Sequence, residues 1–132
     1  MTEPHDMVAM MPFAAAIGVE IDSATKDEVV GRLPYAIERT TGGGALHGGA
    51  LMALADSVGA VCAFLNLPPG AVTSTTSSST IFMRAVRDGA VTATARPLHV
   101  GRSTIAVITE LRDRDGRLVA QTTQSQAVLA QR

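Results

Sequence analysis

The first candidates for chemistry lie in one stretch, ALHGGALMALADSVGA, over residues 45–60. It carries His47, Gly48 and Gly49 and then becomes apolar except for a single carboxylate, Asp56. Free N–H groups at a helix N-terminus can bind a carbonyl oxygen as it gains negative charge, and glycine lets a ligand approach them closely. A carboxylate in apolar surroundings is partly desolvated, and such groups cluster at functional sites. The stretch therefore combines a candidate carbonyl-binding turn with a candidate functional carboxylate.

Asp56 is distinguished by the helix face on which it falls. At 100° per residue a bulky apolar stripe forms, made of Leu51, Leu54, Val58, Val61 and Leu65. Asp56 lies about 170° from the centre of that stripe, on a face shared with Met52, Ala53, Gly59, Ala60 and Ala63. This small-residue face is too apolar to be freely solvated, so we expect it to meet a second subunit or a ligand. The alternative is an Asp56 that bonds backbone groups or lies at a solvated edge.

The other candidates also have structural interpretations. The two glycines can form an ordinary turn before a helix. His47 can hydrogen-bond the backbone and hold the loop instead of acting as a base. Cys62 lies within the helix, where an inert buried thiol is favoured over a nucleophile. The chain has no G-x-S-x-G elbow and no phosphate-binding P-loop, which removes two other kinds of site.

The first half of the chain predicts one long helix that follows short elements. Residues 14–22 predict a short helix that passes into a strand, and the alternating residues of 28–35 predict a strand. Consecutive glycines make residues 40–49 a loop. A helix over 49–65 follows, and it is stopped by Pro68, Pro69 and Gly70.

The second half predicts strands at 72–83, 90–100, 102–112 and 117–129, with Asp-Gly turns between the later ones. Short connections make neighbouring strands antiparallel. The fold class is therefore α+β, with an antiparallel sheet wrapped around one long central helix. A length of 132 residues fits a single domain over 1–132, in which residues 1–13 form an N-terminal extension that could be helical.

A run of serine and threonine, TSTTSSST, covers residues 73–80. It can be a flexible low-complexity loop, but the apolar residues that flank it and the strand preference of threonine favour a strand. Such a strand would present a row of hydroxyl groups at Thr73, Thr75, Ser77 and Ser79, which could line a polar groove and hold a water molecule.

Composition excludes several classes of partner. The net charge is −1, and the chain has no Trp, one Tyr and three Phe, which argues against nucleic acid and anionic membrane surfaces. A single cysteine forms no internal disulfide and no cysteine-based zinc cluster, so we expect no metal and a reducing cytoplasm. The apolar run 49–65 contains Asp56 and Ser57, which favours a buried helix over a membrane span.

Four motifs in order resemble one family. They are GxxHGGxxxxLAD at 44–56, FMR at 82–84, HVGRS at 99–103 and DRDGRLVAQ at 113–121. Over residues 17–129 the chain resembles the hotdog-fold thioesterases of the phenylacetate-degradation type. The resemblance implies a hotdog fold and hydrolysis of acyl-coenzyme A thioesters, with no cofactor because coenzyme A is part of the substrate.

The resemblance also implies roles for particular residues. Asp56 corresponds to the general base or nucleophile, and Gly48 or Gly49 to the amide that polarises the carbonyl. Thr75 corresponds to a hydroxyl that helps to hold water, with Thr73 as the alternative register. Coenzyme A phosphates would meet Arg84 and Arg102, with Gly101 and Ser103 beside the latter. Thr41 stands six residues before His47, where many members carry Asn.

The resemblance further implies dimers whose sheets join edge to edge, usually paired into homotetramers, with sites between subunits. Asp56 would then act on a thioester bound at the helix N-terminus of the neighbouring subunit. The alternatives are a non-catalytic acyl-coenzyme A sensor, a hotdog dehydratase and a purely structural oligomer. Release of thiol from acyl-coenzyme A distinguishes the thioesterase from all of these.

Overall fold

A computed structural model describes residues 3–130 of the chain. The described chain begins with three short helical segments, α1 (Pro4–Met7), η1 (Val8–Met10) and α2 (Pro12–Ile17). A fourth, η2 (Ile37–Arg39), follows the hairpin of the first two strands. The long helix is α3 (Gly48–Phe64). The strands are β1 (Glu20–Ala24), β2 (Val29–Pro34), β3 (Ala71–Phe82), β4 (Ala90–Val100), β5 (Thr104–Arg112) and β6 (Leu118–Ala130). The predicted α+β fold class is confirmed, with element bounds within one to two residues of those expected.

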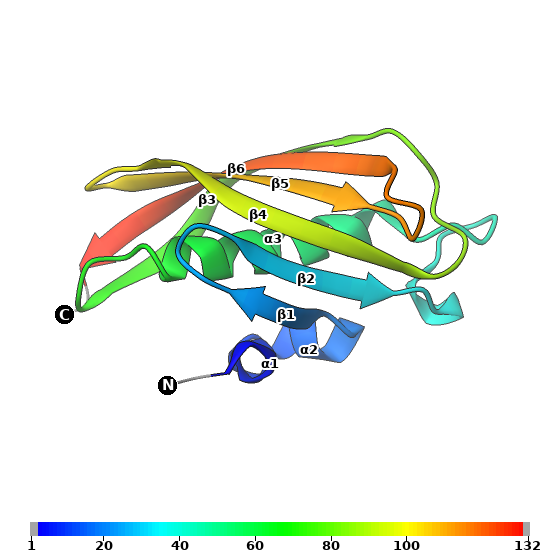
Figure 1. The fold of residues 1–132 in the computed structure, drawn as a ribbon, viewed down its shortest axis with the longest axis horizontal. Helices are drawn as coiled ribbons and strands as arrows, with labels where there is room; N and C mark the ends of the chain where they lie inside the picture. Colours follow the sequence, from blue (N-terminus) through cyan, green and yellow to red (C-terminus); the bar gives the residue numbers. More distant parts are fainter. Residues whose placement is uncertain (1–2, 131–132) are drawn as a thin grey trace.

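The six strands form one antiparallel sheet in the order β1-β2-β4-β5-β6-β3, and α3 lies along one face of it (Figure 1). The strand β3 follows the helix in sequence but pairs with β6 at the far edge of the sheet. The loop before α3 and the β3–β4 connection lie at one end of the sheet, and the β4–β5 turn lies at the other (Figure 1). Among residues 3–130, no helix combines the length and the hydropathy needed to cross a membrane.

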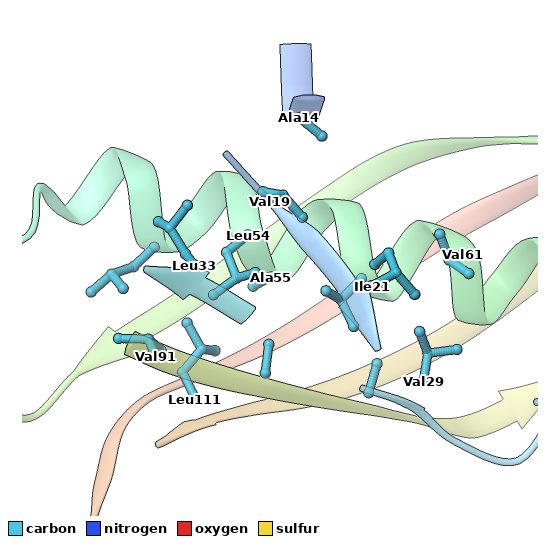
Figure 2. Packing of buried hydrophobic residues seen from close by; sticks show 14 of the residues in the cluster. Ala14, Val19, Ile21, Val29, Leu33, Leu54, Ala55, Val61, Val91 and Leu111 are labelled. Atoms are coloured by element: carbon cyan, nitrogen blue, oxygen red, sulfur yellow. The ribbon is translucent and has the colours of Figure 1, made fainter. Parts of the chain in front are cut away.

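The bulky stripe of α3 packs on the sheet as the periodicity predicts. Leu51, Leu54, Val58 and Val61 are at most 6% exposed, and Figure 2 shows the helix above Val91 and Leu111 of the strands. Burial of each such side chain contributes about 1.5–3 kcal/mol. This packing fixes the rotation of α3 and so decides where Asp56 faces.

The expectation for the opposite face of α3 is partly wrong. Gly59 and Ala63 are buried by the chain itself rather than by a second subunit or a ligand. The Gln124 side chain of β6 lies directly against Gly59. The reason is that side chains of β6 and β3 pack against that flank of the helix, while Met52 and Ala60 stay at least partly exposed.

The predicted hydroxyl row on β3 is half right. Thr73 and Thr75 face inward and are partly buried, but the β3–β6 register shifts between Thr75 and Ser77. A β-bulge adds one residue and reverses which side chains face inward after it. Ser77 and Ser79 are therefore exposed. Thr80 faces inward instead, and its hydroxyl lies 2.8 Å from that of Thr122.

Candidate active site

The carboxylate of Asp56 is held by two strands that come together beside the helix. Its Oδ1 accepts a hydrogen bond of 2.7 Å from the Thr75 hydroxyl on β3 and one of 3.0 Å from Gln124 Nε2 on β6. Among residues 3–130, Oδ2 has no such partner, and the Asp56 side chain is only partly buried. The structure thus favours a carboxylate with one anchored and one available oxygen over a solvated surface charge.

Thr75 acts on the carboxylate and is itself constrained. Its Oγ1 accepts a hydrogen bond of 2.6 Å from Gln126 Nε2 and donates to Asp56. A hydroxyl has one proton, and Thr75 donates it in the hydrogen bond to the carboxylate. It can hold a water only as an acceptor, through its remaining lone pair. The alternative register residue, Thr73, hydrogen-bonds Gln126 Oε1 and the Ala127 carbonyl.

Gln124 and Gln126 were missed by the sequence reasoning. Both are fully buried on β6, at 1% and 0% exposure, although a strand that covers a helix is expected to turn apolar residues inward. A signal was present, because Thr122, Gln124 and Gln126 stand at every second position of a predicted core strand. Polar residues at three successive inward positions indicate a buried hydrogen-bond network.

Among residues 3–130, the N-terminus of α3 has one amide without an acceptor. His47 caps the helix. Its Nδ1 accepts a hydrogen bond of 2.8 Å from the Gly49 N–H, and its carbonyl oxygen accepts hydrogen bonds from the Ala50 and Leu51 amides. His47 therefore holds the turn, as its structural interpretation predicted. The Gly48 N–H is left without an acceptor among residues 3–130. Of the two candidate carbonyl-binding amides, Gly48 is the one available to a ligand.

Gly48 lines a groove of about 350 Å³ between the helix N-terminus and the β3–β4 connection. Phe82 packs against Gly48, since its ring atoms would lie 3.3–3.8 Å from a Cβ at that position. Arg84 lines the same groove and is exposed. The groove therefore places one of the two predicted phosphate-binding arginines beside the candidate carbonyl site.

Asp56 and Gly48 of one chain do not come together. They are eight residues apart on the same helix, which separates them by about 12 Å along the axis. A single carbonyl group cannot contact the Gly48 N–H and the Asp56 carboxylate of the same chain at once. The structure thus brings Asp56 together with Thr75, and leaves the Gly48 amide at a separate point of the surface.

Two further groups of predicted residues lie elsewhere. Gly101, Arg102 and Ser103 form the β4–β5 turn, at the end of the sheet opposite Arg84 (Figure 1). The ten residue-to-residue steps along β4 separate those ends by about 33 Å, so one chain does not offer both arginines to one phosphate group. Thr41 is exposed in the loop before α3, where its backbone pairs with Ala45.

Cys62 is fully buried within α3. Burial raises the pKa of its thiol to about 11, and the negative charge of Asp27 adds to the effect. A protonated, buried thiol is a poor nucleophile, which agrees with the inert interpretation. Within residues 3–130, no three His, Cys, Asp or Glu side chains converge in a way that could hold a metal ion.

Comparison with known proteins identifies the family. Residues 43–120 match the profile of the thioesterase superfamily, and the chain belongs to that superfamily. It is 30% identical over 113 residues to the proofreading thioesterase EntH of Cronobacter turicensis, which covers 86% of this chain and 82% of that protein. A crystal structure of a thioesterase from Haemophilus influenzae superposes with a TM-score of 0.91 at 24% identity, over 98% of this chain and 93% of that one. The predicted hotdog fold is confirmed.

A candidate esterase of Vibrio cholerae is 42% identical over 76 residues, which are 58% of this chain. The alignment spans 51% of that protein, so this chain matches about half of its length.

Proposed function

We propose that this chain hydrolyses acyl-coenzyme A thioesters, with Asp56 as general base or nucleophile and the Gly48 N–H as the donor to the thioester carbonyl. The observation that carries the proposal is the carboxylate of Asp56, anchored through Oδ1 and available at Oδ2 on a helix face of small residues. Membership of the thioesterase superfamily and similarity to EntH support thioester hydrolysis as the reaction class.

The site would be completed by a second copy of the chain. The distance of about 12 Å along the helix axis requires Asp56 and Gly48 to come from different copies. The strand β3 supports this arrangement, because it is a 12-residue edge strand with no neighbour on its outer side among residues 3–130. Long exposed edges are usually paired or covered. We therefore propose a homodimer through β3, alone or as half of a dimer of dimers.

In the proposed mechanism the thioester carbonyl oxygen accepts a hydrogen bond from the Gly48 N–H. Asp56 of the other copy takes a proton from a water molecule, and the hydroxide adds to the carbonyl carbon. The carbon–sulfur bond then breaks, the electron pair leaves with sulfur, and the coenzyme A thiolate is protonated by solvent. In the nucleophilic alternative Asp56 Oδ2 adds directly, expels the thiolate and forms a mixed anhydride that water hydrolyses. Arg84, beside Gly48, supports binding of the anionic coenzyme A portion.

The acyl group is proposed to be apolar. A groove of about 450 Å³ begins one helical turn beyond Asp56, at Ala60, and continues to Phe64. Its other lining residues are Met7, Met10, Met11, Val61, Val72 and Thr73. Methionine side chains adapt to ligands of different shape, and the Thr73 hydroxyl already donates within the chain. Nothing in this lining offers a free partner to a charged acyl group.

The test is thiol release from a panel of aryl, short-chain, medium-chain and long-chain acyl-coenzyme A thioesters, with Asp56→Asn measured alongside. Because Cys62 is buried, a thiol reagent reports released coenzyme A without a contribution from the folded protein. We expect Asp56→Asn to lower kcat by at least about 100-fold. Tight binding without thiol release from any thioester would indicate a sensor, and full activity of Asp56→Asn would refute the role of the carboxylate.

A single turnover in water labelled with oxygen-18 separates the two roles of Asp56. General-base catalysis puts the label into the released acid and leaves the protein unlabelled. A mixed anhydride that water opens at Cγ of Asp56 instead puts the label into the Asp56 side chain and releases unlabelled acid, so a labelled Asp56 identifies the nucleophilic route. Mass spectrometry of the product and of the peptide that contains residue 56 reads both outcomes.

A further inference from the structure

The inner face of β6 carries polar side chains where the fold calls for apolar ones. Thr122, Gln124 and Gln126 are at most 1% exposed, and Gln124 reaches Asp56 on α3. Burial of an amide is unfavourable unless the hydrogen bonds it makes to water are replaced. The replacement partners of the two glutamines therefore show what these residues are for.

The hydrogen bonds form a chain with one direction. The Thr73 hydroxyl shares its one proton between the Ala127 carbonyl at 2.9 Å and Gln126 Oε1 at 3.1 Å, and Gln126 Nε2 donates to Thr75 Oγ1 at 2.6 Å. Because Thr75 Oγ1 accepts a hydrogen bond from Gln126, the hydroxyl proton of Thr75 points away from Gln126 and toward Asp56. Gln124 Nε2 adds a second donor to the same carboxylate oxygen. Both glutamines thus act on Oδ1 and leave Oδ2 outside the network.

Gln124 is a poor choice for stability alone. Its Oε1 is buried and has no hydrogen-bond partner among residues 3–130. The side chain also needs a glycine opposite, since a methyl group at position 59 would collide with Gln124 Oε1. Glycine in the middle of a helix is itself unfavourable relative to alanine. The unpartnered oxygen and the helical glycine both lower stability. The contact that accompanies them is the hydrogen bond from Gln124 to Asp56.

We propose that Gln124 and Gln126 are positioning residues for Asp56. Gln124 donates directly to Oδ1, and Gln126 orients the Thr75 hydroxyl so that it also donates there. The carboxylate is held in one rotamer, and Oδ2 is presented to the water or the thioester. This inference rests on the proposed function, because it assigns the two residues to the reaction that Asp56 performs.

The experiment combines kinetics and stability on the full-length protein. Gln124→Met keeps the length and volume of the side chain but removes the donor. We expect kcat to fall by about 10- to 100-fold, the range for a hydrogen bond to a charged group, with KM unchanged. The melting temperature should stay the same or rise, because a buried amide with an unpartnered oxygen is replaced by an apolar group of similar shape. Thr122→Val, two positions away on the same inward face, is the matched control and should keep wild-type kcat.

Two double variants separate positioning from a general structural effect. Gln124→Met should have no further effect on the residual rate in an Asp56→Asn background, and Gln126→Met should have none in a Thr75→Val background. Gly59→Ala offers an independent route, since it displaces Gln124 while improving helix propensity; we expect it to lower kcat as Gln124→Met does.

Each outcome decides a separate question. Wild-type kcat in Gln124→Met, or a loss of kcat matched by a loss of melting temperature, would overturn the positioning role. Additive losses in the Asp56→Asn background would overturn it as well. A wild-type protein that hydrolyses no thioester would instead refute the proposed function on which the inference rests.

Discussion

Replacing Gly48 by proline would test the proposed carbonyl-binding amide, because proline removes one hydrogen-bond donor, the backbone N–H. Gly48 is the first residue of α3, and its N–H has no acceptor among residues 3–130, so no hydrogen bond of the folded chain is lost. Proline is favoured at the first helical position. It also requires an extended residue before it, and His47 already has φ −64° and ψ 134°. The backbone is therefore prepared for the substitution.

The expected size of the effect follows from the role of the amide. Loss of one donor to a developing oxyanion costs about 2.7–4 kcal/mol of transition-state stabilisation, or about 100- to 1,000-fold in kcat. The matched control is Gly48→Ala, which keeps the N–H and adds a Cβ. That Cβ would lie 3.3 Å from the Phe82 ring. The ring is 46% exposed and can move, so we expect alanine to cost less than about tenfold.

The assay is steady-state thiol release by wild type, Gly48→Ala and Gly48→Pro on the best thioester of the panel, with thermal unfolding of each. A Gly48→Pro variant that matches Gly48→Ala in kcat would refute the assignment of the Gly48 N–H. Equal kcat values would mean that the volume at residue 48 matters rather than the amide.

Three other predictions follow from the same geometry. Inactive Gly48→Pro and Asp56→Asn chains, unfolded and refolded together at equal amounts, should regain about a quarter of wild-type activity, since half of random dimers are mixed and each mixed dimer has one intact site; no recovery in mixed dimers would contradict a site shared between copies. Ala60→Phe should shorten the preferred acyl chain in the thioester panel by filling the groove beside Phe64, and an unchanged chain-length profile would contradict an acyl group bound there. The pKa of Cys62 is raised to about 11 from an ordinary 9.0, so its stabilising contribution is complete below pH 9 and is lost as the pH rises to 11, by up to about 2–3 kcal/mol. The free energy of unfolding, measured with urea, should therefore fall more steeply over that range in wild type than in Cys62→Ala, and equal slopes would contradict the burial of the thiol.

The strand β3 shows how far local rules reach. Its residue types favour a strand, and its inward hydroxyls at Thr73 and Thr75 follow from the period of two. The bulge that turns Ser77 and Ser79 outward does not follow from these rules. It depends on the fit between two paired strands that bend together around a helix, and no property of the Ser/Thr run alone specifies that fit.

The sequence by itself determined the elements that hold the site and the residues at its centre. The spacing of apolar residues specified α3 and placed Asp56 opposite its packed face, and the glycines marked the turn at its start. These features depend on neighbours three or four positions apart, which a single chain segment contains. The tertiary structure decided which groups reach Asp56. Gln124 lies 68 residues away in sequence, and its contact exists because β6 pairs with both β5 and β3.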